Sequence, residues 1–515
     1  MQKQTSKLAK NTAFLFFRQI FIVLLNLYTV RLLLNTLGVS EFATYNVMLS
    51  VVMIASFLTT SMNTIIQRFF SFAMGRKSHL SLPQVHNAGL QVSVIAAIIS
   101  IFGLETVGVW FVNTQLVIEP EIVQSAKILF QFLVLAFVLS IFSTFYSSVI
   151  MAHEDMHAFA FISILEAVLR LAAAFSLIYF GRDLLVLYGI FLAGIALIVL
   201  LCFLLYSIRK YEECRPRRMV FEACVLKEML AFGGWTIFGQ VTTVSRSHAL
   251  TILVNQAFSP ATVAARAISA TVGSQVLTFS RNFSSALHPP IIKAYASDDK
   301  EQTFSLIFFG SKITFYLVWM MTLPVIATAP GLLTLWLGSP PAETVLFTQL
   351  AMVENVFVAI SLPLMTAVRA TGNVRFYELS LGTLQALVLL LSWFAIRAGA
   401  PAYFIFVIAI MINILMYGLR LLLTQRLVGL PLKAYSRTVL LPVLLVVILS
   451  SGLVLGIVGW VPEAQTLTLN IASLLAVLTI FILLPVVIFR FGLSKPERTF
   501  VVSAVRRKFS KSGGR

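Results

Sequence analysis

Long apolar runs alternate with short polar segments along the whole 515-residue chain. A run of about 20 apolar residues is long enough to cross the hydrocarbon core of a bilayer as a helix. The pattern therefore predicts about 14 membrane-spanning helices. Their predicted ranges are 11–36, 41–72, 86–113, 122–151, 157–180, 184–208, 229–255, 261–291, 302–336, 342–368, 375–398, 402–427, 438–461 and 466–490.

The longest internal polar segment, 208–229, lies near the middle of the chain and suggests two helical halves. At an offset of 220 residues, 33–47 aligns with 253–267, and Asn35 lies over Asn255. Internal repeats of helices place the substrate path of many transporters between two lobes. We therefore expect an all-α polytopic membrane protein with two pseudo-symmetric six-helix lobes and a C-terminal helix pair. The expected parts are an N-lobe over 1–208, a basic cytoplasmic connector over 209–228, a C-lobe over 229–430, and the C-terminal pair with its basic tail over 431–515.

Composition agrees with a membrane protein, since 59% of the residues are hydrophobic and 11% are charged. The net charge of +18 would suggest nucleic acid in a soluble protein, but the basic residues cluster in alternate loops. The opposite set of loops holds only Arg182 and Arg397. Because Lys and Arg mark cytoplasmic loops, both termini are expected on the cytoplasmic side of the inner membrane, and no nucleic-acid partner is expected.

Nine cations fall inside the predicted helices: Arg18, Arg31, Arg68, Lys127, Arg170, Arg246, Arg266, Arg281 and Lys312. A charge at the bilayer centre costs about 2.5–3.5 kcal/mol or more, so such residues face a wet interior or reach to the interface. Four of the nine lie near helix ends and fit both a position facing a wet interior and one reaching to the interface: Arg31, Arg68, Lys127 and Lys312. Arg170 follows Glu166 by one turn, a spacing that predicts an ion pair.

Polar stripes on the predicted helices gather several of these cations. On the eighth helix Arg266, Gly273, Ser284 and His288 share one face, with Arg281 to one side. Guanidinium groups bind phosphate oxygens through paired, charge-assisted hydrogen bonds. Intramembrane acids, which a site for cationic drugs or sodium needs, are few: Glu105, Glu166, Glu354 and Glu378. The residues expected to bind a diphosphate or anionic glycan lipid are Arg18, Arg68, Arg246, Arg266, Arg281 and His288; no catalytic or metal-binding residue is assigned.

The first predicted helix and the start of the second read NTAFLFFRQIFIVLLNLYTVRLLLNTLGVSEFATYNV, and a second copy surrounds AFSPATVAARAIS. With the exit HPPIIKAYASDD after the eighth helix, the chain resembles the polysaccharide flippases of the multidrug/oligosaccharidyl-lipid/polysaccharide exporter superfamily, in the O-antigen and exopolysaccharide branch. One departure is Ala43, where related sequences often have Gly.

The resemblance implies a non-enzymatic transporter that moves undecaprenyl-diphosphate-linked oligosaccharide to the outer leaflet by alternating access, for surface polysaccharide such as the O-antigen of lipopolysaccharide. It implies lumen cations at Arg18, Arg68, Arg246, Arg266 and Arg281. The expected partners are that polyprenyl-diphosphate lipid, membrane lipids, and polymerase or ligase machinery of the same pathway. No cofactor is implied, and coupling to H⁺ or Na⁺ is left open.

Three alternatives remain open at this point. His153-Glu154-Asp155-Met156-His157 matches H-E-x-x-H, which on a helix binds zinc in metalloproteases, although here it falls in a predicted loop. A cation-coupled multidrug antiporter needs acidic sites, which the N-lobe barely supplies. A peptidoglycan lipid-precursor flippase would select the same arginines as an oligosaccharide flippase.

Overall fold

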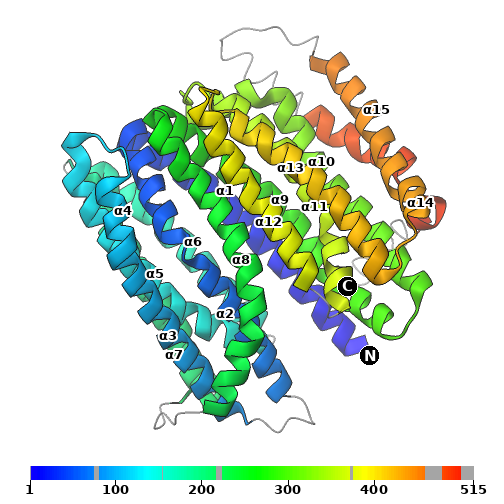
Figure 1. Cartoon of the computed structure of the whole chain (residues 1–515), viewed down its shortest axis with the longest axis horizontal. Helices are drawn as coiled ribbons and strands as arrows, with labels where there is room; N and C mark the ends of the chain where they lie inside the picture. The colour runs from blue at the N-terminus through cyan, green and yellow to red at the C-terminus, as the bar shows by residue number, and fades with distance from the viewer. Residues whose placement is uncertain are drawn as a thin grey trace, which may run out of the picture. The chain divides into compact units, whose positions relative to one another are not determined.

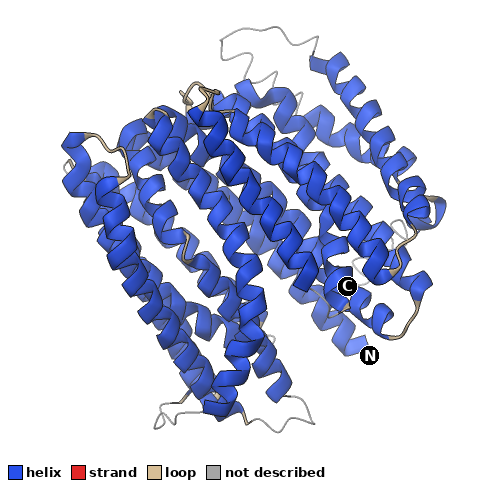
Figure 2. Cartoon of the chain, viewed as in Figure 1, coloured by secondary structure: helices blue, strands red, loops and turns tan. Residues whose placement is uncertain are grey.

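A computed structural model gives the structure of the chain, and its described residues are helical with short connections (Figure 2). The structure describes residues 2–74, 81–153, 155–181, 183–215, 223–371, 375–458 and 478–499, and the side chains of the first helix from Gln19 onward. No strand occurs within these ranges. The predicted all-α class is confirmed.

Figure 1 traces the helices along the chain from blue to red. The α-helices are α1 (Gln2–Met53), α2 (Ser56–Ala73), α3 (Leu82–Gly103), α4 (Val109–Thr114), α5 (Val123–Ala152), α6 (Met156–Ser176), α7 (Leu184–Lys210), α8 (Ala223–Ala257), α9 (Pro260–Ala296), α10 (Lys300–Leu337), α11 (Thr344–Ala370), α12 (Arg375–Arg397), α13 (Phe404–Val428), α14 (Leu432–Tyr435) and α15 (Leu441–Val458). Short 3₁₀ and π turns are η1 (Leu104–Gly108), η2 (Pro120–Ile122), η3 (Leu177–Tyr179), η4 (Glu212–Cys214), η5 (Ser436–Leu440) and η6 (Ile488–Gly492).

In the described part of the chain, ten helices are long and apolar enough to cross a membrane. The polytopic membrane class is therefore confirmed. α8 and α9 have the length but are not among the ten, because their charged and hydroxyl side chains lower their hydropathy. The last predicted helix, 466–490, begins in a segment outside the described residues, so the number 14 stays a prediction.

The first two predicted helices join directly at a kink at Gly38, without a loop between them. Gly38 has φ 76° and ψ 173°, a backbone that glycine adopts readily because it has no Cβ. The prediction of one uninterrupted helix over 41–72 is wrong, since the helix breaks at 54–55. There the N–H of Ala55 donates to the carbonyl of Val52 (3.1 Å), an i→i+3 bond that tightens the turn.

The helices form two compact units. Unit 1 comprises Met1–Ala267 with Gln385–Ala402, and unit 2 comprises Ile268–Leu384 with Tyr403–Arg515. In unit 1, α5 lies along α7, and α8 packs against α1, α2 and α3. In unit 2, α11 packs between α10 and α13, and α15 contacts α10. This grouping does not test the predicted lobe boundaries, which stay predictions.

Three helices of unit 2 approach closely at Gly310 on α10. A Cβ added there would lie 2.8 Å from Cδ1 of Leu287 on α9 and 3.0 Å from Cγ of Pro363 on α11. Because the proline ring cannot yield, we expect Gly310→Ala to lower the free energy of unfolding by about 1–3 kcal/mol. Thermal unfolding in detergent measures this. Gly452→Ala is the matched control, since a Cβ at Gly452 meets open space; equal losses in the two variants would contradict the packing account.

Candidate functional site

Two of the predicted arginines lie on the consecutive helices α8 and α9 in unit 1. Arg266 on α9 is 7% exposed, and its Nη2 donates a hydrogen bond to the carbonyl of Ser247 on α8 (3.3 Å). Arg246, the residue before Ser247, is half-buried. His248, the residue after it, lies within electrostatic range of Arg266. We call the guanidinium groups of Arg246 and Arg266, with the neighbouring imidazole of His248, the α8–α9 cationic cluster.

The turn between α8 and α9 explains how Arg266 comes to lie beside Ser247 of the preceding helix. Only Phe258 and Ser259 separate the two helices, and the hydroxyl of Ser259 accepts a hydrogen bond from the N–H of Thr262 (3.4 Å). Pro260 opens α9, where its fixed φ suits the first helical position. Arg266 lies six residues further on, about 9 Å along the helix axis. The cluster is therefore positioned near this turn, which the predicted topology places at the outer side.

Two further predicted residues belong to unit 1. Arg68 lies on α2 and is exposed, and α2 packs against α8 in the same unit. Arg18 lies on α1, but its side chain is outside the described residues. The binding roles of both residues stay predictions.

The remaining predicted residues lie on the part of α9 that belongs to unit 2. Arg281 and His288 are both exposed. Arg369, in the last turn of α11, lies within electrostatic range of His288 and is not among the residues predicted from the polar stripes. The predicted cations are thus divided between unit 1 and unit 2. That all of them bind one ligand stays a prediction.

Each of the four carboxylates predicted inside the membrane accepts a hydrogen bond. The donors are Gln131 to Glu105 (3.2 Å), Arg170 to Glu166 (2.9 Å), Asn413 to Glu354 (3.2 Å) and Arg369 to Glu378 (3.2 Å). The predicted Arg170–Glu166 ion pair is confirmed, and both Nε and Nη2 of Arg170 contribute to it. These pairs are structural contacts, distinct from the α8–α9 cationic cluster.

Lys312, one of the cations predicted near a helix end, is buried in an ion pair within unit 2. It is 3% exposed, and its ammonium lies 2.5 Å from the carboxylate of Glu497. The partner lies in the short helix 495–499, 185 residues later in the chain. No local sequence pattern connects the two residues.

The H-E-x-x-H match is divided between two helices. α5 ends at Ala152 and α6 begins at Met156, so His153 and His157 do not share one helix face as the zinc motif requires. His153 instead pairs through Nε2 with Glu213 (3.0 Å) and stacks on Tyr211, with ring centroids 4.1 Å apart. Within the described ranges, no group of three or more His, Cys, Asp or Glu side chains could hold a metal ion.

Asp155, in the same connection, ties the end of α7 to the start of α6. Its carboxylate accepts hydrogen bonds from the hydroxyls of Tyr206 (2.5 Å) and Tyr211 (3.3 Å) and from the ammonium of Lys210. Burial raises the pKa of the Asp155 carboxyl, but the hydrogen bonds from Lys210 and Tyr206 outweigh burial and hold its pKa below the ordinary 3.8. The first residues of the basic connector, Lys210 and Tyr211, are thus bound to the start of α6.

The depressed pKa of Asp155 makes this contact dependent on pH. A group whose pKa is lowered by folding stabilises the protein above its unfolded pKa, and that stability is lost as the pH falls through the folded pKa. We expect Asp155→Asn to lower the free energy of unfolding by about 1–3 kcal/mol at pH 7 and by much less near pH 3. Thermal unfolding at the two pH values measures this. Glu119→Gln, at an exposed carboxylate, is the control; an equal loss at both pH values would refute the charge account.

Asn255, at the end of α8, makes a contact that the internal repeat did not predict. Its Nδ2 donates to the carbonyl of Val117 (3.0 Å), and its Oδ1 accepts from the N–H of Val117 (3.1 Å). Gln256 also donates to the carbonyl of Gln115 (3.1 Å). The aligned Asn35 is exposed. Both asparagines close a helix, but only the structure shows that Asn255 fastens the 115–117 connection within unit 1.

Solved exporter structures share this arrangement of helices. "Lipid II flippase MurJ, inward closed conformation" matches with a TM-score of 0.67 at 12% identity, covering 94% of this chain and 99% of that chain. An inward-facing multidrug resistance MATE family transporter of the MOP superfamily matches with a TM-score of 0.59 at 15% identity, covering 80% and 99%. The Vibrio cholerae MATE transporter VcmN, in a mutant form, matches with a TM-score of 0.56 at 17% identity, covering 82% and 98%. The class is therefore a polytopic membrane protein with the fold of the exporter superfamily.

A comparison with family profiles assigns the chain to a family within this fold. The profile of the family described as "Polysaccharide biosynthesis protein" matches residues 8–274, which is more than half of the chain. The chain belongs to this family, and the predicted superfamily is confirmed. The matched residues include Arg246 and Arg266. No curated protein matches the chain in a sequence comparison. The structural relatives named above are a flippase and transporters.

Proposed function

We propose that the protein is a flippase that moves polyprenyl-diphosphate-linked oligosaccharide from the cytoplasmic to the outer leaflet by alternating access. The product would serve cell-surface polysaccharide, such as the O-antigen of lipopolysaccharide. The α8–α9 cationic cluster carries the proposal, because it presents two guanidinium side chains on adjacent helices in the family-matched region. Guanidinium groups suit the diphosphate of a lipid-linked sugar through paired hydrogen bonds.

The proposal includes a location in the membrane and a set of partners. The distribution of Lys and Arg favours the inner membrane with both termini in the cytoplasm. The diphosphate would engage Arg246 and Arg266, together with Arg18, Arg68, Arg281 and His288 along the path, while the hydrocarbon tail stays in the bilayer. Polymerase or ligase machinery of the pathway would take up the product.

A flippase for a peptidoglycan lipid precursor is the second candidate. The match to the lipid II flippase MurJ, which covers 94% of this chain, favours it. A multidrug antiporter is disfavoured, because drug cations need acidic sites, and the four intramembrane carboxylates already accept hydrogen bonds within the protein.

Disrupting the gene and identifying the lipid that accumulates in the inner leaflet tests the proposal. We expect loss of surface polysaccharide and accumulation of a polyprenyl-diphosphate oligosaccharide. Accumulation of a peptidoglycan precursor would establish the second candidate instead. Unchanged lipid pools with increased sensitivity to cationic drugs would refute both flippase assignments.

A further inference from the structure

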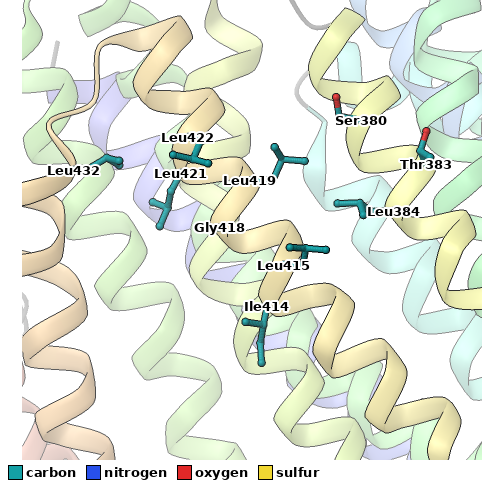
Figure 3. A pocket seen from close by; sticks show the side chains of 10 residues that line it. All are labelled: Ser380, Thr383, Leu384, Ile414, Leu415, Gly418, Leu419, Leu421, Leu422 and Leu432. Atoms are coloured by element: carbon teal, nitrogen blue, oxygen red, sulfur yellow. The ribbon is translucent and has the colours of Figure 1, made fainter. Parts of the chain in front are cut away.

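A groove in unit 2 lies between α12 and α13 and reaches α14 (Figure 3). It has a volume of about 910 Å³. Figure 3 shows the side chains of α13 on one side and those of α12 on the other. The residues on which the argument depends are Leu384, Ile414, Leu415, Gly418, Leu422 and Leu432.

The groove offers apolar surface almost throughout. Its two hydroxyls, on Ser380 and Thr383, donate to carbonyls of their own helix (2.7 and 2.9 Å), so they are already bonded. Ile414, Leu415 and Leu422 are 48%, 55% and 58% exposed. In a bilayer, an exposed apolar helix face is covered by hydrocarbon chains. The chemistry of the lining therefore selects an alkyl chain rather than a polar ligand.

The length of the groove matches one leaflet. Ile414 and Leu422 are eight residues apart, about 12 Å along α13. Half of the hydrocarbon core of a bilayer is about 15 Å thick. An acyl chain of a phospholipid occupies one leaflet, whereas a long polyprenyl chain extends well beyond it. The dimensions therefore favour a phospholipid as the occupant.

Cations lie beside the end of the groove that the topology places at the cytoplasmic surface. Arg375 begins α12, Arg426 lies in the last turn of α13, and Lys433 lies on α14. All three are exposed. A cation near the membrane surface strengthens binding of an anionic head group about fivefold. The charge at this end therefore complements an anionic lipid of the cytoplasmic leaflet.

We propose that the α12–α13 groove binds one acyl chain of an anionic phospholipid from the cytoplasmic leaflet, with the head group held by Arg426 and Lys433. The site is separate from the α8–α9 cationic cluster, and the lipid is a resident ligand rather than the transported substrate. It would fill the space between two helices that the protein itself leaves open.

Gly418 provides a sharp test, because a Cβ added there meets no atom within 4 Å. Gly418→Leu would therefore place a branched side chain in the groove from a Cβ that has open space around it, and Gly452→Leu, whose Cβ also has open space on α15, is the matched control. Each protein is reconstituted in nanodiscs of phosphatidylglycerol and phosphatidylcholine, and bound lipid is counted by native mass spectrometry. We expect one phosphatidylglycerol per chain in the wild type and in Gly452→Leu, and about tenfold less in Gly418→Leu.

A second variant tests the head-group contact. Arg426→Gln with Lys433→Gln should weaken phosphatidylglycerol binding about 25-fold and leave phosphatidylcholine unchanged. Unaltered binding to Gly418→Leu, or equal binding of the two phospholipids to the wild type, would overturn the proposal. Displacement of phosphatidylglycerol by an equimolar polyprenyl phosphate would also overturn it, since the groove would then belong to the substrate's tail.

Discussion

Replacing Arg266 by alanine should reduce export of surface polysaccharide by about 10- to 100-fold. The change removes a guanidinium that is buried beside Ser247 on α8, and with it the paired hydrogen bonds that the proposed function assigns to the diphosphate. Arg266→Lys should retain part of the activity, because it keeps the charge but loses the fork of donors. Surface glycan is measured in cells that carry equal amounts of each variant in the membrane.

Lys127→Ala is the control for this experiment, since Lys127 is an exposed cation on α5. It should export normally. Thermal unfolding of purified Arg266→Ala separates a folding defect from a binding defect. A variant that folds as the wild type does and still exports normally would refute the cationic site.

Replacing Lys312 by alanine should produce the largest loss of stability, about 3–5 kcal/mol. The change leaves Glu497 partly buried without its ammonium partner. Burial raises the pKa of the Glu497 carboxyl, and the hydrogen bonds from Lys312 and Ser494 reverse this and hold its pKa below the ordinary value. Both the N–H and the hydroxyl of Ser494 donate to the same carboxylate (2.7 and 2.8 Å), so one carboxylate caps its own helix and anchors it to α10.

The double variant Lys312→Met with Glu497→Leu separates charge from packing. Because it removes both buried charges together, it should recover much of the stability lost in Lys312→Ala. Denaturant unfolding in detergent compares the wild type, Lys312→Ala, the double variant and the control Lys127→Ala. If Lys312→Ala were as stable as Lys127→Ala, the anchoring role of the pair would be wrong.

The helices were predictable because the signal for them is local. A run of apolar residues determines a membrane-spanning helix with little reference to the rest of the chain, and most predicted ranges agree with the observed helices. The kink at Gly38 also has a local cause in the backbone freedom of glycine. The break at 54–55 has no glycine or proline to mark it, and the pattern missed it for that reason.

Contacts between distant residues were not predictable in the same way. Lys312 and Glu497 are separated by 185 residues, and Asn255 and Val117 by 138. Such pairs depend on how helices pack, which hydropathy does not encode. Ser247 and Arg266 are an intermediate case, because a short turn between two consecutive helices brings α8 and α9 side by side there. The membership of Arg18, Arg281 and His288 in the same site remains a prediction from the polar stripes.

Translocation in a purified system tests the central claim most directly. The protein is reconstituted in liposomes with a fluorescent polyprenyl-diphosphate oligosaccharide, and a membrane-impermeant quencher reports which leaflet holds the label. The account predicts that wild-type protein exposes inner-leaflet label to the quencher and that Arg266→Ala does not. Label that stays in its leaflet with wild-type protein, or that moves equally well with Arg266→Ala, would contradict it.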